Sequence, residues 1–309
     1  MKAHQLKARR DRTSTVPPRL EWIWGVEALE RSAESLAKLP APFLLVGEAK
    51  LLSPWRKRIS GAWIEAGLEI LPLSFPEGSE CCEEQAKAIA AVAKAKKAGT
   101  LIAWGGGKCL DSVKWAGLIS KLPVVTVPSS AATCAAATNV VVAHSAEGRV
   151  LDIIDLESPP AICVADFELL KSAPERTLKA GLADTAAKWL EWKAVEEPQG
   201  PGADAAQRAY GIVMEAGSPN ELLWEANLKL SAQASVEGGA PAAWAHDYCA
   251  AASKNPESRA WLHGEWVGLG LLFQAEKLGQ DAAPLKAWLA SNGLPLIAPF
   301  HVDLSALSE

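Results

Sequence analysis

The first half of the chain alternates short apolar runs with segments of helical pattern, and this alternation narrows the available folds more than any other feature. Each run has the length of a buried strand, and amphipathic or alanine-rich segments separate the runs. Such alternation is typical of parallel βαβ units, in which helices cover both faces of one sheet. Strands are expected at Phe43–Gly47, Ile70–Leu73, Thr100–Trp104, Val124–Val127 and Ala161–Ala165, helices at 53–65, Glu83–Lys97 and Cys109–Ser120, and a hairpin around Glu147-Gly148.

The composition changes near residue 166. Beyond Asp166, Val, Ile and Thr become scarce, Ala, Leu, Trp and Glu dominate, and helical periodicity continues to the last residues. We therefore expect two domains. The first is an α/β, Rossmann-like domain over residues 1–166, with a flexible tail over 1–18, and the second is an all-helical domain over residues 167–309.

Charge and hydropathy exclude several classes of partner. The formal net charge is −5, and acidic and basic residues are mixed along the chain, whereas a nucleic-acid surface needs a concentrated basic face. No uninterrupted apolar run approaches the roughly 20 residues that a membrane-spanning helix needs. The six cysteines show no CxxC spacing, which favours free thiols in a reducing compartment. These features predict a cytoplasmic protein that binds neither nucleic acid nor membranes.

A glycine-rich turn follows one of the predicted strands. The run Gly105-Gly106-Gly107-Lys108 lies between strand and helix, where glycines allow close backbone approach and free N–H groups attract an anion. The turn matches neither the GxGxxG fingerprint nor the P-loop spacing, so a plain tight connection is an equal alternative. A second turn of small residues, 128–133, follows the next strand, and two such turns at neighbouring strand ends favour a dinucleotide site.

Three residues of the helical half could together hold a metal. Asp184 lies in an otherwise apolar helical stretch, where an unpaired carboxylate would be costly to bury. His246 and His263 are two of only five histidines in the chain. One carboxylate and two imidazoles suit Zn²⁺ or Fe²⁺, with positions left for substrate. Spacing alone does not establish a metal site, because a single histidine on a helix is more often a core or surface residue than a ligand.

At these residues the chain resembles the iron-containing (group III) alcohol dehydrogenases, in particular their glycerol dehydrogenase-like and hydroxycarboxylate dehydrogenase-like branches. The matching pieces occur in the same order along the chain, which makes the combination specific. They are Gly105–Asp111, the Val127-Pro128-Ser-Ser turn, Ala180-Gly-Leu-Ala-Asp184-Thr, Ala245-His246 and His263-Gly-Glu-Trp-Val-Gly268.

The resemblance implies a dehydroquinate synthase-like fold and hydride transfer between NAD or NADP and a small alcohol or carbonyl compound. It implies one divalent metal, zinc or iron, held by Asp184, His246 and His263, which would be the catalytic centre. A homo-oligomer is also expected, without an identifiable interface. The cofactor residues implied by the resemblance are Gly106, Gly107, Lys108 and Asp111 at the phosphates, and Ser129, Ala132, Thr138 and Val140 at the nicotinamide half.

Several residues depart from the family pattern. Glycerol dehydrogenases carry an aspartate that contacts the polyol where this chain has Cys134. A neutral residue there removes a charge that would repel a carboxylate, which favours a 2-hydroxy or 2-oxo acid as substrate. The family's second histidine is replaced by Cys249, which puts a proton relay through it in doubt. Glu48 follows the first predicted strand and leaves the choice between NAD and NADP open.

Three alternatives to this function stay open at the level of sequence. The chain could be a glycerol dehydrogenase proper, or it could resemble glycerol-1-phosphate dehydrogenase, although no basic residues for a phosphate substrate are identifiable. Dehydroquinate synthase shares this architecture, but it normally has glutamate where this chain has Asp184, which counts against that activity. A degenerate member that binds nucleotide without turnover is the alternative of another class, and the complete ligand set argues against it.

Overall fold

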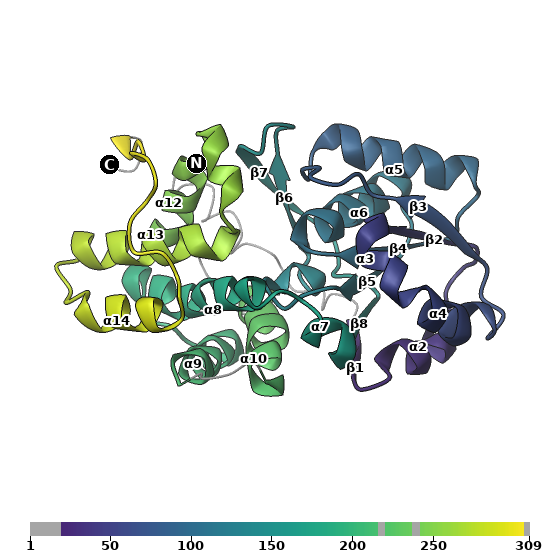
Figure 1. Cartoon of the computed structure of the whole chain (residues 1–309), viewed down its shortest axis with the longest axis horizontal. Coiled ribbons are helices and arrows are strands. Elements are labelled where there is room, and N and C mark those ends of the chain that lie inside the picture. Colours follow the sequence, from purple (N-terminus) through teal and green to yellow (C-terminus); the bar gives the residue numbers. More distant parts are fainter. Residues whose placement is uncertain (1–19, 216–219, 237–241, 306–309) are drawn as a thin grey trace. The chain divides into compact units, whose positions relative to one another are not determined.

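The computed structural model describes residues 20–215, 220–236 and 242–305 (Figure 1). Contacts group the chain into two compact units: an α/β unit of residues 16–130 and 135–173, and a helical unit of residues 131–134 and 174–309, each as far as it is described. The tail predicted over residues 1–18 lies outside the described residues. The domain limits of 1–166 and 167–309 stay a prediction, and residue 166 is the last residue of strand β8.

The α/β unit is built on one parallel sheet of six strands, in the order β1-β8-β5-β4-β2-β3. All five strand predictions are confirmed to within a residue or two. The strands are β1 (Glu21–Gly25), β2 (Phe43–Gly47), β3 (Ile70–Ser74), β4 (Thr100–Gly105), β5 (Val124–Pro128) and β8 (Ile162–Asp166).

Strand β1 was not expected from the sequence. It pairs with β8 only, at one edge of the sheet, and Ile23 is its single fully buried residue. An edge strand is less enclosed than a central one, so its sequence lacks the continuous apolar run that marks β2 or β5.

The helices of the α/β unit cover both faces of this sheet. In Figure 1, α5 and α6 lie on one side of the strands, and α2 and α4 lie on the other. Phe43 and Leu45 of β2 belong to a core cluster with Leu29 and Trp63, whereas the alternate residues Leu44 and Val46 are also fully buried. Burial on both faces explains why these strands are continuously apolar rather than alternating. The helices are α2 (Ala28–Leu36), α3 (Ala49–Leu52), α4 (Arg56–Ile59), α5 (Glu83–Ala95), α6 (Gly107–Ser120) and α7 (Phe167–Lys171).

Two helix predictions differ from the structure at their beginnings. The helix expected from residue 53 begins at Ala49 and passes through a 3-10 turn, Ser53–Trp55, and ends in a π-helical turn, Ser60–Ile64. Pro54 has no N–H to donate, so it does not open a new helix here but interrupts the bonding pattern of an existing one. Helix α6 begins at Gly107, two residues before the predicted position.

The predicted hairpin is confirmed. Strands β6 (Val140–His144) and β7 (Val150–Asp155) pair antiparallel as a separate two-stranded sheet, with the turn at Glu147-Gly148. Val141 packs with Cys81 and Leu156 in a small cluster of its own. The hairpin therefore extends the α/β unit without adding to its main sheet.

The helical unit contains long helices, as its composition predicts. In the part of the chain that the structure describes, no helix is both long and apolar enough to cross a bilayer. The α-helices are α8 (Glu175–Val195), α9 (Pro201–Met214), α10 (Glu221–Glu225), α11 (Ser231–Val236), α12 (Trp244–Ala252), α13 (His263–Lys277) and α14 (Ala283–Ser291).

A buried carboxylate ties the carboxyl end of β8 to the helices around it. Asp166 is fully buried and accepts hydrogen bonds from the backbone N–H groups of Glu168, Leu169 and Leu29. The guanidinium of Arg58 contacts both of its oxygens, at 2.9 and 3.2 Å. This set of bonds satisfies a charge that would otherwise be costly to bury.

We predict that Arg58→Met lowers the free energy of unfolding by about 3 kcal/mol, because it leaves the buried Asp166 without its counter-charge. The control is Lys38→Met, which removes an exposed ion pair to Glu34 and is expected to change stability by less than about 0.5 kcal/mol. Urea unfolding at neutral pH measures both. Equal losses in the two variants would contradict the role given to Asp166.

Candidate metal centre

Three helices of the helical unit carry the three predicted metal ligands. Asp184 lies in the middle of α8, His246 near the beginning of α12, and His263 is the first residue of α13. Asp184 is buried, the His246 side chain is nearly so, and half of the His263 side chain is exposed. The site therefore has a closed end at Asp184 and an open end at His263.

Glycines allow these three helices to approach closely. A Cβ on Gly264 would lie 1.8 Å from the carbonyl oxygen of Ala180, so α13 contacts the backbone of α8 at this point. A Cβ on Gly270 would lie 2.3 Å from the carbonyl oxygen of Ala245, which brings α12 equally near. Each glycine lies within one or two turns of a ligand, and the backbone contacts therefore set the distances between the ligands.

The ligand atoms of the three residues converge. The Nε2 atoms of His246 and His263 lie 3.2 and 3.5 Å from Oδ1 of Asp184. All three ligand atoms fall within 4.8 Å of one another. One carboxylate oxygen and two imidazole nitrogens form a donor set that suits Zn²⁺ or Fe²⁺, and three protein ligands leave coordination positions open.

The electrostatics of the site favour positive charge between its carboxylates. Burial raises the pKa of the Asp184 carboxyl, but the ammonium of Lys188 and the two imidazoles outweigh it and hold the pKa well below its usual value. Burial lowers the pKa of His246, but the carboxylates of Glu191 and Asp184 raise it to about 9. A divalent cation supplies the positive charge that protons supply in its absence, so the residues present fit a metal.

Two residues beside the ligands were missed in the sequence. Lys188 and Glu191 follow Asp184 by four and seven positions, which places all three on one face of α8. The Lys188 Nζ lies 3.7 Å from Oδ1 of Asp184, and the Glu191 carboxylate contacts Nδ1 of His246 at 2.6 Å. The spacing was visible in the sequence, but it does not say which helix this face meets.

Cys249 lies one turn beyond His246 on α12, beside the imidazole of His263. Its sulfur is 3.4 Å from Nδ1 of His263, so Nε2 of that ring is the nitrogen turned toward Asp184. Cys249, which stands where the resemblance implies a second histidine, thus contacts a ligand ring through its thiol.

The two glycine-rich turns of the α/β unit lie at the carboxyl ends of adjacent strands. Gly106 precedes α6 in an extended conformation, Gly107 begins the helix, and a Cβ on Gly106 would meet no atom within 4 Å. The backbone N–H of Ser129, after β5, donates to the carbonyl of Gly105 at 3.0 Å. The structure therefore brings the two turns together beside a helix N-terminus, as a phosphate-binding site requires.

Lys108 and Asp111, which the resemblance places at the cofactor phosphates, each form an ion pair. Lys108 is half-exposed, and its Nζ lies 2.7 Å from the buried carboxylate of Glu80. Asp111 is buried, with Lys114 Nζ at 2.8 Å and the N–H of Val142 at 3.0 Å. These contacts give Asp111 a structural role, and its role at the phosphates stays a prediction.

Lys114, which the sequence did not single out, connects Asp111 with the segment before the hairpin. Its buried ammonium donates to the carbonyl oxygens of Ala135, Thr138 and Val140. Thr138 and Val140 are thereby fixed beside α6, and their contact with the nicotinamide half stays a prediction.

Residues 131–134 belong to the helical unit although the chain reaches them directly from β5. The carbonyl of Ala131 accepts a hydrogen bond from Asn227, at 2.9 Å, and a Cβ on Gly181 would lie 3.0 Å from the Cα of Ala132. Cys134 is 6% exposed. Cys134 is therefore largely enclosed, and its role toward a substrate stays a prediction.

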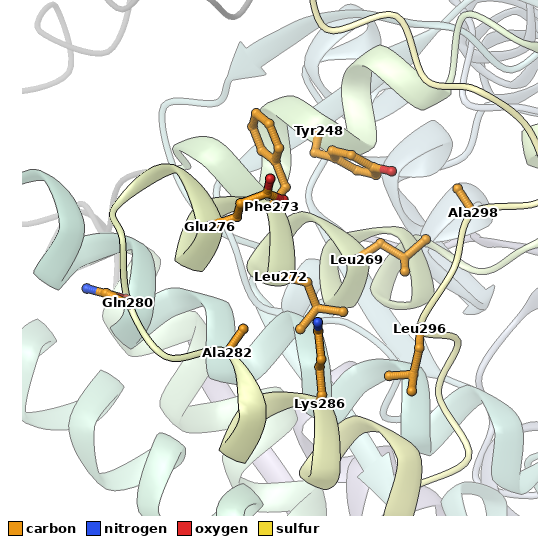
Figure 2. Close-up of a pocket in the computed structure, with 10 residues that line it drawn as sticks. All are labelled: Tyr248, Leu269, Leu272, Phe273, Glu276, Gln280, Ala282, Lys286, Leu296 and Ala298. Atoms are coloured by element: carbon orange, nitrogen blue, oxygen red, sulfur yellow. The ribbon is translucent and has the colours of Figure 1, made fainter.

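A separate cavity of about 420 Å³ lies between α12, α13, α14 and the segment after α14 (Figure 2). Its apolar lining includes Leu269, Leu272 and Phe273 of α13, and Lys286 of α14 projects toward it. None of the three ligands lines it, so it is not the metal centre. The remaining lining residues are Tyr248, Glu276, Gln280, Ala282, Leu296 and Ala298.

Comparison with known proteins agrees with this fold. Residues 19–167 match the family model of iron-containing alcohol dehydrogenases. A solved structure described as a probable glycerol dehydrogenase from Sinorhizobium meliloti 1021 superposes with a TM-score of 0.77 at 25% identity, covering 90% of this chain and 82% of the other. The chain is thus similar to the iron-containing alcohol dehydrogenases, by the family model over residues 19–167 and by fold over most of its length. The expected Rossmann-like and helical architecture is confirmed.

Two curated proteins are similar to this chain along most of their length. Glycerol dehydrogenase from Pseudomonas putida is 28% identical over 278 residues, which are 82% of this chain and 75% of the relative. Hydroxycarboxylate dehydrogenase A from Escherichia coli K12 is also 28% identical, over 318 residues, which are 94% of this chain and 80% of the relative. Identity alone therefore does not separate the two branches.

We predict that Gly264→Ala weakens metal binding by at least tenfold and destabilises the protein, because the added methyl group must push α13 away from α8. The matched control is Gly211→Ala on α9, where a Cβ meets no atom within 4 Å. That change is expected to stabilise the helix by up to about 1 kcal/mol without altering metal affinity. Zinc titration in competition with a chromogenic chelator distinguishes the two, and an unchanged affinity in Gly264→Ala would refute the packing argument.

Proposed function

We propose that this chain is a metal-dependent oxidoreductase that transfers a hydride between NAD(P) and a small alcohol or carbonyl compound, with 2-hydroxy and 2-oxo acids as the substrate class. The observation that carries the proposal is the convergence of Asp184, His246 and His263 in a chain that resembles the iron-containing alcohol dehydrogenases. Glu48 follows β2, where the ribose of a dinucleotide lies in Rossmann-like folds, and it suits NAD(H).

When bound, the metal supplies a Lewis acid for the substrate's C–O bond, and the nicotinamide accepts or donates the hydride. The chain's own residues would do the rest by position and charge. Asp184, His246 and His263 would hold the ion, and the two glycine turns would hold the cofactor phosphates through backbone N–H groups. No described side chain is assigned as general base, because Cys249 stands where the family has a histidine.

The substrate class is inferred from charge. Lys188 projects from α8 beside Asp184, and its side chain is 13% exposed, so its ammonium lies within reach of the ligand set but little screened by water. A carboxylate adjacent to the reacting carbonyl would pair with such a cation. The neutral Cys134 adds no repelling charge. Glycerol dehydrogenase activity is the second candidate, favoured by the similarity to glycerol dehydrogenases.

We propose a cytoplasmic enzyme that acts on free small molecules and binds no nucleic acid. The sequence pI of about 5.7 and the net charge of −5 support this.

We predict that removing the metal with a chelator abolishes turnover, and that zinc or iron restores it to the wild type but not to Asp184→Asn. The variant should lose roughly 100-fold or more in kcat/KM, since several kcal/mol of transition-state stabilisation depend on the ion. Asp204→Asn, at an exposed position of α9, is the control. A wild type that binds no metal after supplementation would instead support nucleotide binding without turnover.

We predict that Lys188→Met lowers kcat/KM for a simple 2-oxo acid by at least about tenfold, because the substrate carboxylate loses its partner in a poorly hydrated site. Reduction of the neutral dihydroxyacetone should change by less than about threefold, since it carries no charge for Lys188 to bind. Lys193→Met, at an exposed position of the same helix, is the control. Equal losses for the acidic and neutral substrates would show that Lys188 does not recognise the carboxylate.

A further inference from the structure

Glu191 is a fully buried carboxylate whose bonds all converge on the beginning of α12. Its Oε1 accepts hydrogen bonds from the backbone N–H groups of Ala243, Ala245 and His246, at 2.8, 2.9 and 3.0 Å. Its Oε2 contacts Nδ1 of the His246 ring at 2.6 Å. One carboxylate oxygen thus binds the backbone at the beginning of α12, and the other binds the ring of His246.

The contacts of Oε1 replace a missing helix cap. Helix α12 has no side-chain cap at Ala243, so its first N–H groups would lack acceptors without Glu191. A carboxylate at a helix N-terminus is also stabilised by the helix dipole. Glu191 therefore fixes where α12 begins relative to α8, and with it the backbone of His246.

The contact of Oε2 orients the imidazole. A carboxylate can only accept, so Nδ1 of His246 keeps its proton, and in the neutral ring that binds a metal the lone pair is on Nε2. That Nε2 faces Asp184 at 3.2 Å. The ring of His263 lacks this support, since its Nδ1 faces the sulfur of Cys249 at 3.4 Å and its side chain is half-exposed. The two histidine ligands are therefore unequal, and His246 is the anchored one.

We propose that Glu191 is the positioning residue of the metal centre, which sets the tautomer of His246 and its place at the beginning of α12. The inference rests on the proposed metal site. In this role Glu191 contacts neither substrate nor cofactor, and it acts on the metal only through His246.

Glu191→Gln separates this role from that of a helix cap. The introduced amide oxygen can still accept from the three backbone N–H groups, so the cap is kept. Its NH₂ group then faces Nδ1 and donates to it, which moves the ring proton to Nε2, the nitrogen that must bind the metal. A residue that only capped α12 would tolerate this change, whereas a residue that sets the tautomer would not.

The test is the affinity of the purified full-length protein for Zn²⁺, measured by competition with a chelator. We expect Glu191→Gln to remain folded by circular dichroism and to bind zinc 10- to 100-fold more weakly than the wild type. The matched control is Asp166→Asn, which alters another buried carboxylate with three backbone N–H donors and one charged side-chain partner, but no ligand contact. Its zinc affinity should stay within twofold. Wild-type affinity in Glu191→Gln, or an equal loss in Asp166→Asn, overturns the proposal.

A second measurement covers the case in which Glu191→Gln does not fold. In the zinc-bound wild type with ¹⁵N-labelled histidine, long-range NMR correlations should place the proton of His246 on Nδ1 and the metal on Nε2, with the signal assigned by a His246→Gln variant. The reverse arrangement overturns the role of Glu191 alone. A wild type that binds neither zinc nor iron overturns the metal site as well, so the two failures are distinguishable.

Discussion

The candidate site depends on the absence of side chains between three helices. At Gly264 the backbone of α13 lies against that of α8, and at Gly270 it lies against that of α12. Backbone contact leaves little freedom in the distance between helix axes, so Asp184, His246 and His263 are brought within reach of one ion by packing rather than by long side chains. At the closed end, Glu191 accepts hydrogen bonds from the beginning of α12, and its contact with Nδ1 of His246 orients one ligand ring.

The α/β unit could be predicted from the sequence because its central strands are buried on both faces. Runs such as Phe43–Gly47 contain no polar interruption, and turn residues bound them. The errors have equally physical causes. The edge strand β1 buries too little to have an apolar run, and Pro54 was taken to begin a helix that it only interrupts.

The candidate site could be predicted only in part. Asp184 and the two histidines were weak candidates by spacing, and the ordered resemblance to the family joined them. The residues that surround these ligands could not be predicted from the sequence, because they act through contacts between elements far apart in sequence. Glu191 meets His246 across 55 positions, and Lys114 meets Val140 across 26. A residue's own helix face can be read from its spacing, but its partner cannot.

The short segment 131–134 has a consequence for the connectivity of the molecule. The chain leaves the α/β unit after Ser130, contributes Ala131–Cys134 to the helical unit, and returns at Ala135 before it leaves again near residue 174. The helical unit is therefore discontinuous in sequence. A fragment cut at 174 would lack the carbonyl of Ala131, leave Asn227 without that acceptor, and expose the face of α8 at Gly181. A chimaera that keeps this packing would have to exchange residues 131–134 together with the helices after residue 174.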